Sequence, residues 1–181
     1  DEPPPAVPVF YGDVYGPGPM LLFVQLEPLI GRTAVLGGIA RFLQDGGSGS
    51  VADLQAALEA ESGEDLQPYF DAWVFGTGEP TYPSFTVTTE DQGGGNLLVT
   101  VTQAADPSGP FPCAVEVDVS GATTTATAVI DFGLAPTMSS ASATIPFTEP
   151  VVGTAVDPRH KVVDQPAGAS ARRARRHVWI F

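Results

Sequence analysis

Few residues in this sequence of 181 could perform acid–base, nucleophilic or metal chemistry. It has two histidines, His160 and His177, and a single cysteine, Cys113. A zinc site carried on one helix needs the spacing His-Glu-x-x-His, with a third protein ligand further along the chain. The two histidines are too far apart for that pattern. We therefore expect no metal or cofactor to be held by this chain alone.

Other candidate groups have plainer interpretations. Asp157 and His160 share one turn, but two ligands are too few for a metal site, and Asp-Pro favours an ordinary turn. Three further aspartates occur without a calcium-binding Asp-x-Asp-x-Asp-Gly loop, so we expect them in solvated loops: Asp91, Asp106 and Asp118. Cys113 has no partner for an internal disulfide and lies in an alternating apolar run, which indicates a buried, inert thiol.

The pattern of apolar residues changes from helical to strand-like between residues 66 and 83. Four apolar residues recur there at helical spacing: Leu66, Phe70, Trp73 and Val74. Gly76 and Gly78 are expected to end this helix, and Pro80 and Pro83 prevent a restart. Strand-like alternation begins directly afterwards in SFTVTTE.

Three more helices are expected before this boundary. The first follows Pro19, is apolar nearly all round and should be buried; Pro28 weakens its last turn and Gly31 ends it. The second covers Thr33–Gln44 and turns five residues inward: Val35, Leu36, Ile39, Phe42 and Leu43. Within it, Gly37 and Gly38 each cost about 1 kcal/mol relative to alanine, or permit close helix packing.

The third helix carries its own start and stop signals. Ser50 and Asp53 approximate a capping box, and Gly63 closes the helix. Its apolar stripe consists of Leu54, Ala57 and Leu58. We therefore expect a small helical bundle before residue 80.

After residue 83 the pattern is that of short strands. The candidate strands are 84–90, 96–104, 112–120, 123–133, 140–147, 151–157 and a short 161–164. Alternation is clear where Val115, Val117 and Val119 face one way and Glu116 and Asp118 the other. About seven strands at this spacing favour an antiparallel sandwich of immunoglobulin-like type.

The expected fold class is therefore an α+β chain in two parts. Residues 1–13 form an extended linker or a cut end, since their acidic, proline-rich sequence is not a signal peptide. Residues 14–80 form the helical part and residues 81–165 the β-sandwich. Residues 166–181 form a flexible basic tail to which we assign no function.

Charge excludes one class of partner. All 21 acidic residues precede the arginine-rich tail, and four basic residues oppose them there, which leaves −17 before the tail. This large negative charge repels the phosphate backbone of nucleic acids, so nucleic-acid binding is not expected. No apolar stretch approaches the roughly 20 residues that span a bilayer. Composition leaves the localisation open, with a slight preference for an extracellular or cell-envelope setting.

The order of motifs in the helical part resembles the gluzincin zinc aminopeptidases, peptidase family M-one, which include the membrane alanyl aminopeptidases and leukotriene hydrolases. In that family a Tyr-x-x-Gly segment opens a buried helix, a helix pair follows, and a Ser-Gly-x-x-Leu-x-x-Phe-Phe-x-x-Trp helix ends in Gly-x-Pro. The last motif stands here as Ser62, Gly63, Leu66, Tyr69, Phe70, Trp73, Gly78 and Pro80. The resemblance covers roughly residues 14–83, and many members of the family place a β-sandwich next.

The resemblance implies one catalytic residue. The family's tyrosine stabilises the oxyanion formed when zinc-bound water attacks the peptide carbonyl, and the matching position is Tyr15, with Gly18 three residues later. The family has Glu-Lys between them, whereas this chain has Gly16 and Pro17. Tyr11 is an alternative candidate, and Tyr15 as a packing residue at a helix entrance is another.

The resemblance also implies what lies elsewhere. The chain lacks the family's His-Glu-x-x-His and its Gly-x-Met-Glu-Asn segment, which binds the substrate amine. It therefore resembles a C-terminal part whose partner is the missing N-terminal catalytic portion, with zinc and peptide substrate bound only in the full-length parent. Such a severed part should expose apolar surface on residues 20–29. Two other functions stay open: a non-catalytic immunoglobulin-like binding or scaffold module, and a catalytically dead relative.

Overall fold

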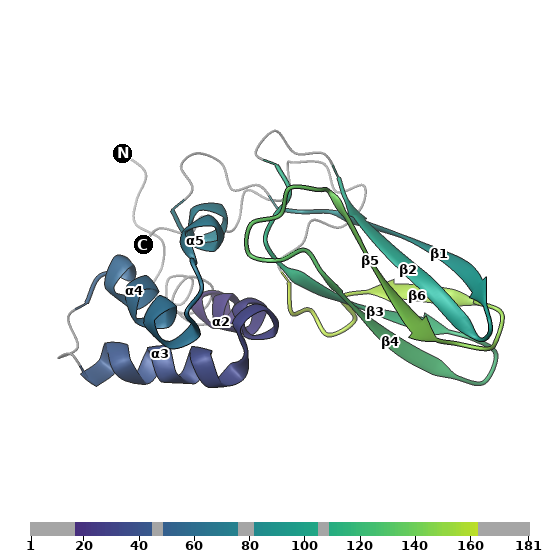
Figure 1. Ribbon diagram of the computed structural model, residues 1–181, viewed down its shortest axis with the longest axis horizontal. Coiled ribbons are helices and arrows are strands. Elements are labelled where there is room, and N and C mark those ends of the chain that lie inside the picture. Colours follow the sequence, from purple (N-terminus) through teal and green to yellow (C-terminus); the bar gives the residue numbers. More distant parts are fainter. Residues whose placement is uncertain (1–16, 45–48, 76–81, 105–108, 163–181) are drawn as a thin grey trace, which may run out of the picture.

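The computed structural model describes residues 17–44, 49–75, 82–104 and 109–162. Over these residues four helices come first and six strands follow, so the chain is α+β in that order. The helices gather at one end and the strands extend away from them (Figure 1). The expected change from helices to strands is confirmed. The signals Gly76, Gly78 and Pro80 lie outside the described residues.

The helices are α2 (Pro17–Ile30), α3 (Arg32–Gln44), α4 (Val51–Ser62) and α5 (Gln67–Trp73). Pro28 lies inside α2 without ending it. The helix ends where Gly31 adopts φ +85°, a left-handed backbone that glycine tolerates. The Gly31 N–H then donates to the Glu27 carbonyl at 2.8 Å.

The predicted capping box of α4 is confirmed. Ser50 accepts a hydrogen bond on Oγ from the Asp53 N–H, and the Asp53 carboxylate accepts one from the Ser50 N–H at 2.7 Å. Gly63 closes the helix with φ 74°. Both ends of α4 are thus set by local sequence, because these groups bond backbone atoms that a helix end leaves without partners.

Close packing of α3 on α4 depends on Gly38. A Cβ at this position would lie 2.6 Å from Leu58 Cδ2 and 2.8 Å from the Leu58 Cα. Glycine therefore lets the two backbones approach, as the sequence suggested. The helical core beneath this contact consists of Leu26, Val35, Leu58, Leu66, Tyr69 and Phe70.

Two expectations about the first helices are wrong. Helix α2 was expected to be buried, yet among its described side chains only Gln25 and Leu26 are buried. Leu36 and Leu43 of α3 were expected to face inward, but both are exposed. The apolar pattern is correct, but the described residues do not cover all of these faces.

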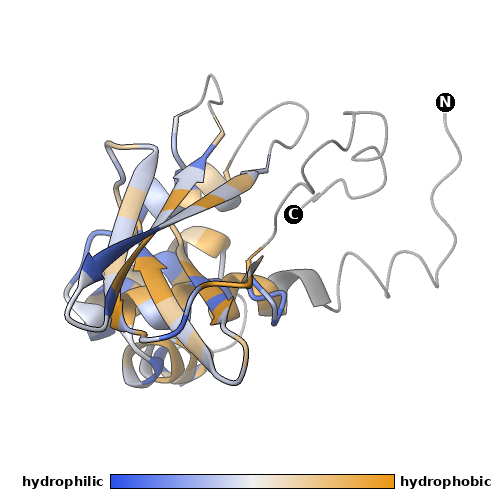
Figure 2. Cartoon of the chain, turned by 90° about the vertical axis from the view of Figure 1, so that its right-hand side faces the viewer, coloured by the Kyte–Doolittle hydropathy of each residue, from blue (hydrophilic) through white to orange (hydrophobic). Residues whose placement is uncertain are grey.

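The strands form two three-stranded antiparallel sheets. One has the order β1-β2-β5 and the other β4-β3-β6. Their bounds are β1 (Phe85–Gly93), β2 (Asn96–Gln103), β3 (Ala114–Ser120), β4 (Thr125–Asp131), β5 (Ser140–Pro146) and β6 (Gly153–Val156). Buried residues of both sheets share one core, so the sheets pack face to face. The strands are accordingly banded with hydrophobic and hydrophilic residues (Figure 2).

Strand β3 shows the predicted alternation, with Val115, Val117 and Val119 fully buried and the acidic residues between them half-buried. The predicted strand at 161–164 is wrong over its described residues, Lys161 and Val162, which are not in a strand. Their N–H groups donate to the Asp157 carboxylate instead, at 2.8 and 2.9 Å. The carboxylate has replaced the backbone partner that a strand would need.

Candidate functional site

The predicted catalytic residue Tyr15 and its alternative Tyr11 lie outside the described residues. Helix α2 begins at Pro17, inside the predicted Tyr-x-x-Gly segment, and Gly18, the last residue of that segment, is in its first turn. The described part of the chain therefore begins two residues after Tyr15, with α2.

Tyr69 of α5 is hydrogen-bonded to the backbone of α2. Its Oη donates a hydrogen bond to the Leu22 carbonyl at 2.7 Å, although the two residues are 47 positions apart. The side chain is 1% exposed, and burial raises the pKa of Tyr69 above its ordinary value. The phenol therefore stays protonated and keeps donating throughout the physiological pH range.

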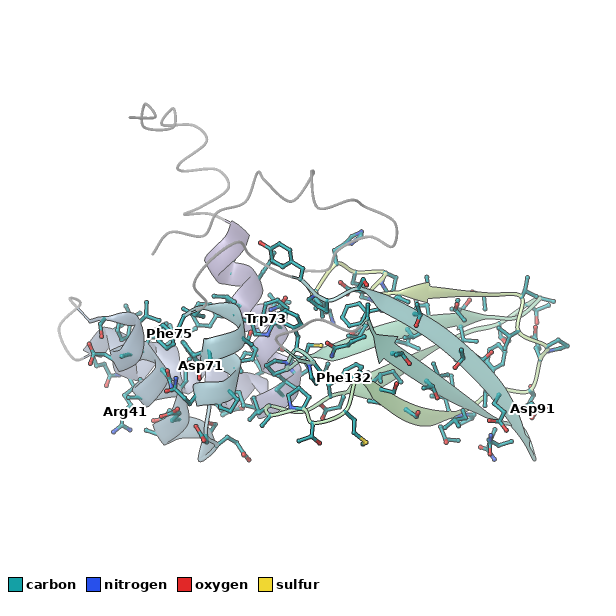
Figure 3. All side chains as sticks on the ribbon, turned by 90° about the horizontal axis from the view of Figure 1, so that it is seen from above. Arg41, Asp71, Trp73, Phe75, Asp91 and Phe132 are labelled. Carbon is teal, nitrogen blue, oxygen red and sulfur yellow. The ribbon has the colours of Figure 1, made fainter. Side chains whose placement is uncertain are left out.

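Trp73, four residues later on α5, attaches the helical part to the β part. Its Nε1 donates to the Pro112 carbonyl at 2.8 Å, and its ring centroid lies 5.0 Å from that of Phe111. Trp73 packs against both hydrophobic cores. Figure 3 shows it at the boundary between helices and strands, with Phe132 on the strand side.

Gln103 holds the segment that receives Trp73. Its Nε2 donates to the Phe111 carbonyl at 2.9 Å, and its Oε1 accepts from the Phe111 N–H at 2.8 Å. Gln103 is 2% exposed, and this two-way pairing satisfies an otherwise costly buried amide. The sequence analysis did not identify this role of Gln103. A signal was present, because Gln103 is a polar residue at an inward-facing position of an alternating strand.

The described residues do not fit a zinc ion. They contain no group of three or more His, Cys, Asp or Glu side chains placed to hold a metal. Asp157 is buried with its carboxylate engaged by backbone N–H groups, and the His160 N–H donates to the Asp157 carbonyl. Burial raises the pKa of Cys113 to about 12, so its thiol is protonated at neutral pH. His177 and Asp106 lie outside the described residues.

The remaining acidic candidates have structural partners. The expectation that Asp91 and Asp118 lie in loops is wrong, because Asp91 lies in β1 and Asp118 in β3. The Asp91 carboxylate accepts from the Gly93 N–H at 2.8 Å, where the pairing of β1 with β2 is irregular. Asp118 accepts from Thr127 Oγ1 at 2.6 Å and pairs with Arg159. Glu116 pairs with both Lys161 and Arg159, and the hydrogen bond from Lys161 is the main reason that its pKa is lowered. These carboxylates stabilise the surface of the β part.

An exposed apolar surface lies on the first two helices. Met20 and Val24, one turn apart on α2, are 68% and 39% exposed. Leu36 and Leu43, two turns apart on α3, are 53% and 63% exposed. We call these four side chains the α2/α3 apolar residues. Residues three, four or seven apart lie on one face of a helix, so each helix presents an apolar face.

None of the helices in the described ranges combines the length and apolarity that a bilayer-spanning segment requires. No protein-family model matches the chain, and no curated protein matches it.

Proposed function

We propose that this chain is the C-terminal part of a zinc-dependent aminopeptidase-like protein of peptidase family M-one. In this proposal Tyr15 donates a hydrogen bond to the oxyanion that develops on the substrate carbonyl. The metal site belongs to the portion that precedes Asp1 in the parent, so peptide substrate is cleaved only in the full-length protein. The β part supports the helices, and we propose that its two sheets form an immunoglobulin-like sandwich.

The α2/α3 apolar residues are the observation that carries this proposal. Between Pro17 and Leu26 the sequence has no charged residue, which is typical of a helix buried on all sides. Yet Met20 is 68% exposed and Val24 is 39% exposed on that helix. Exposed apolar faces on neighbouring elements mark a surface that binds another protein part. The proposed occupant is the zinc-bearing portion of the same polypeptide.

Five helical landmarks of the resemblance that lie in the described ranges give further support, because each has a structural task. Gly63 ends α4 in a left-handed conformation. Leu66, Tyr69 and Phe70 are buried in the helical core. Trp73 joins the two cores. The apolar residues of the motif are therefore spaced so that they pack in the cores. Strands follow the motif along the chain, in the order that the family implies.

A binding module that acts through the loops of the β part is the alternative. Its described loops expose Met138, between β4 and β5, and Val152, between β5 and β6. These are single apolar residues on separate loops, which are common on protein surfaces. By contrast, helices α2 and α3 each expose two apolar side chains on one face, and this pairing favours the aminopeptidase proposal.

The first experiment uses the purified chain. After dialysis it should retain no stoichiometric zinc, and it should not hydrolyse aminoacyl-anilide substrates. One equivalent of retained zinc would overturn the proposal, because the chain would then have a metal site of its own. The coding sequence before Asp1 supplies the second test: His-Glu-x-x-His should occur on the order of 60 to 90 residues upstream.

A further inference from the structure

We draw no further inference here: the strongest candidate, the surface patch of α2/α3 apolar residues on the first two helices, already carries the proposed function, and nothing in the described part of the chain shows what other partner covers it.

Discussion

The indole Nε1 of Trp73 donates a hydrogen bond to the carbonyl oxygen of Pro112 at 2.8 Å, and this contact joins the helical part to the β part. Trp73→Phe should therefore lower the free energy of unfolding by about 1 to 3 kcal/mol, since it leaves a cavity and a carbonyl without its donor. Urea denaturation measures this change. Phe75→Leu, at a half-exposed ring two residues later, should cost less; equal losses would contradict a special role for Trp73.

Adjacent glycines in α3 should respond in opposite ways to alanine. Gly38→Ala places a Cβ 2.8 Å from the Leu58 backbone, so we expect a loss of about 1 to 3 kcal/mol from overpacking. Gly37→Ala meets only the Glu61 side chain, at 3.0 Å, and that side chain can move. The gain of about 1 kcal/mol in helix propensity should make this variant neutral or more stable. Thermal unfolding of both variants checks the difference, and similar melting temperatures would contradict the packing described.

The fold was predictable wherever the signal was local. The capping box of Ser50 and Asp53, the terminus at Gly63 and the alternation of β3 each depend on residues close together in sequence. The strand expected at 161–164 failed because a carboxylate from Asp157, four residues earlier, took the Lys161 N–H. Side-chain competition of this kind is invisible to periodicity.

The contacts around the candidate site were less predictable. Periodicity placed Leu36 and Leu43 on an apolar face of α3, but it cannot say which element covers that face. Likewise Trp73 was recognisable as an apolar position of its helix, and Tyr69 was named only as a landmark of the resemblance. Their donors reach Leu22 and Pro112, which lie 47 and 39 positions away, and only the tertiary fold brings those carbonyls close.

Acid should weaken the contact between β3 and the residues that follow β6. Hydrogen bonding to Lys161, and then to Arg159, lowers the pKa of Glu116 below its ordinary value of 4.5. A carboxyl with a lower pKa in the folded state stabilises the protein above its unfolded-state pKa, and that stability is lost as pH falls through the folded value. Glu116→Gln should therefore reduce stability at neutral pH and flatten its decline below about pH 4.5.

Urea unfolding at neutral pH and in acid measures this effect. Because Arg159 and Lys161 are about half exposed, high salt should diminish the difference between the variant and the wild type. Glu90→Gln, on the exposed face of β1, is the matched control and should keep the wild-type pH dependence. Parallel pH profiles for Glu116→Gln and the wild type would rule out this role for Glu116.

Helix α4 should depend on its N-terminal cap. Ser50→Ala removes the oxygen that accepts from the Asp53 N–H, and we expect a loss of about 1 kcal/mol in the free energy of unfolding. Ser142→Ala, which removes an exposed hydroxyl from the outer face of β5, is a control of the same chemistry and should cost less. Chemical denaturation of both variants decides whether the capping box stabilises α4.

The proposed origin of the chain is tested most directly by the activity of the polypeptide extended upstream of Asp1. We expect the extended protein to bind one zinc ion and to hydrolyse aminoacyl-anilides. Tyr15→Phe in that protein should lower kcat by about 100- to 1,000-fold, the effect of removing one oxyanion donor, and leave KM nearly unchanged. An active extended protein whose kcat is unaffected by Tyr15→Phe would contradict the role of Tyr15, and an extension without His-Glu-x-x-His would contradict the aminopeptidase proposal itself.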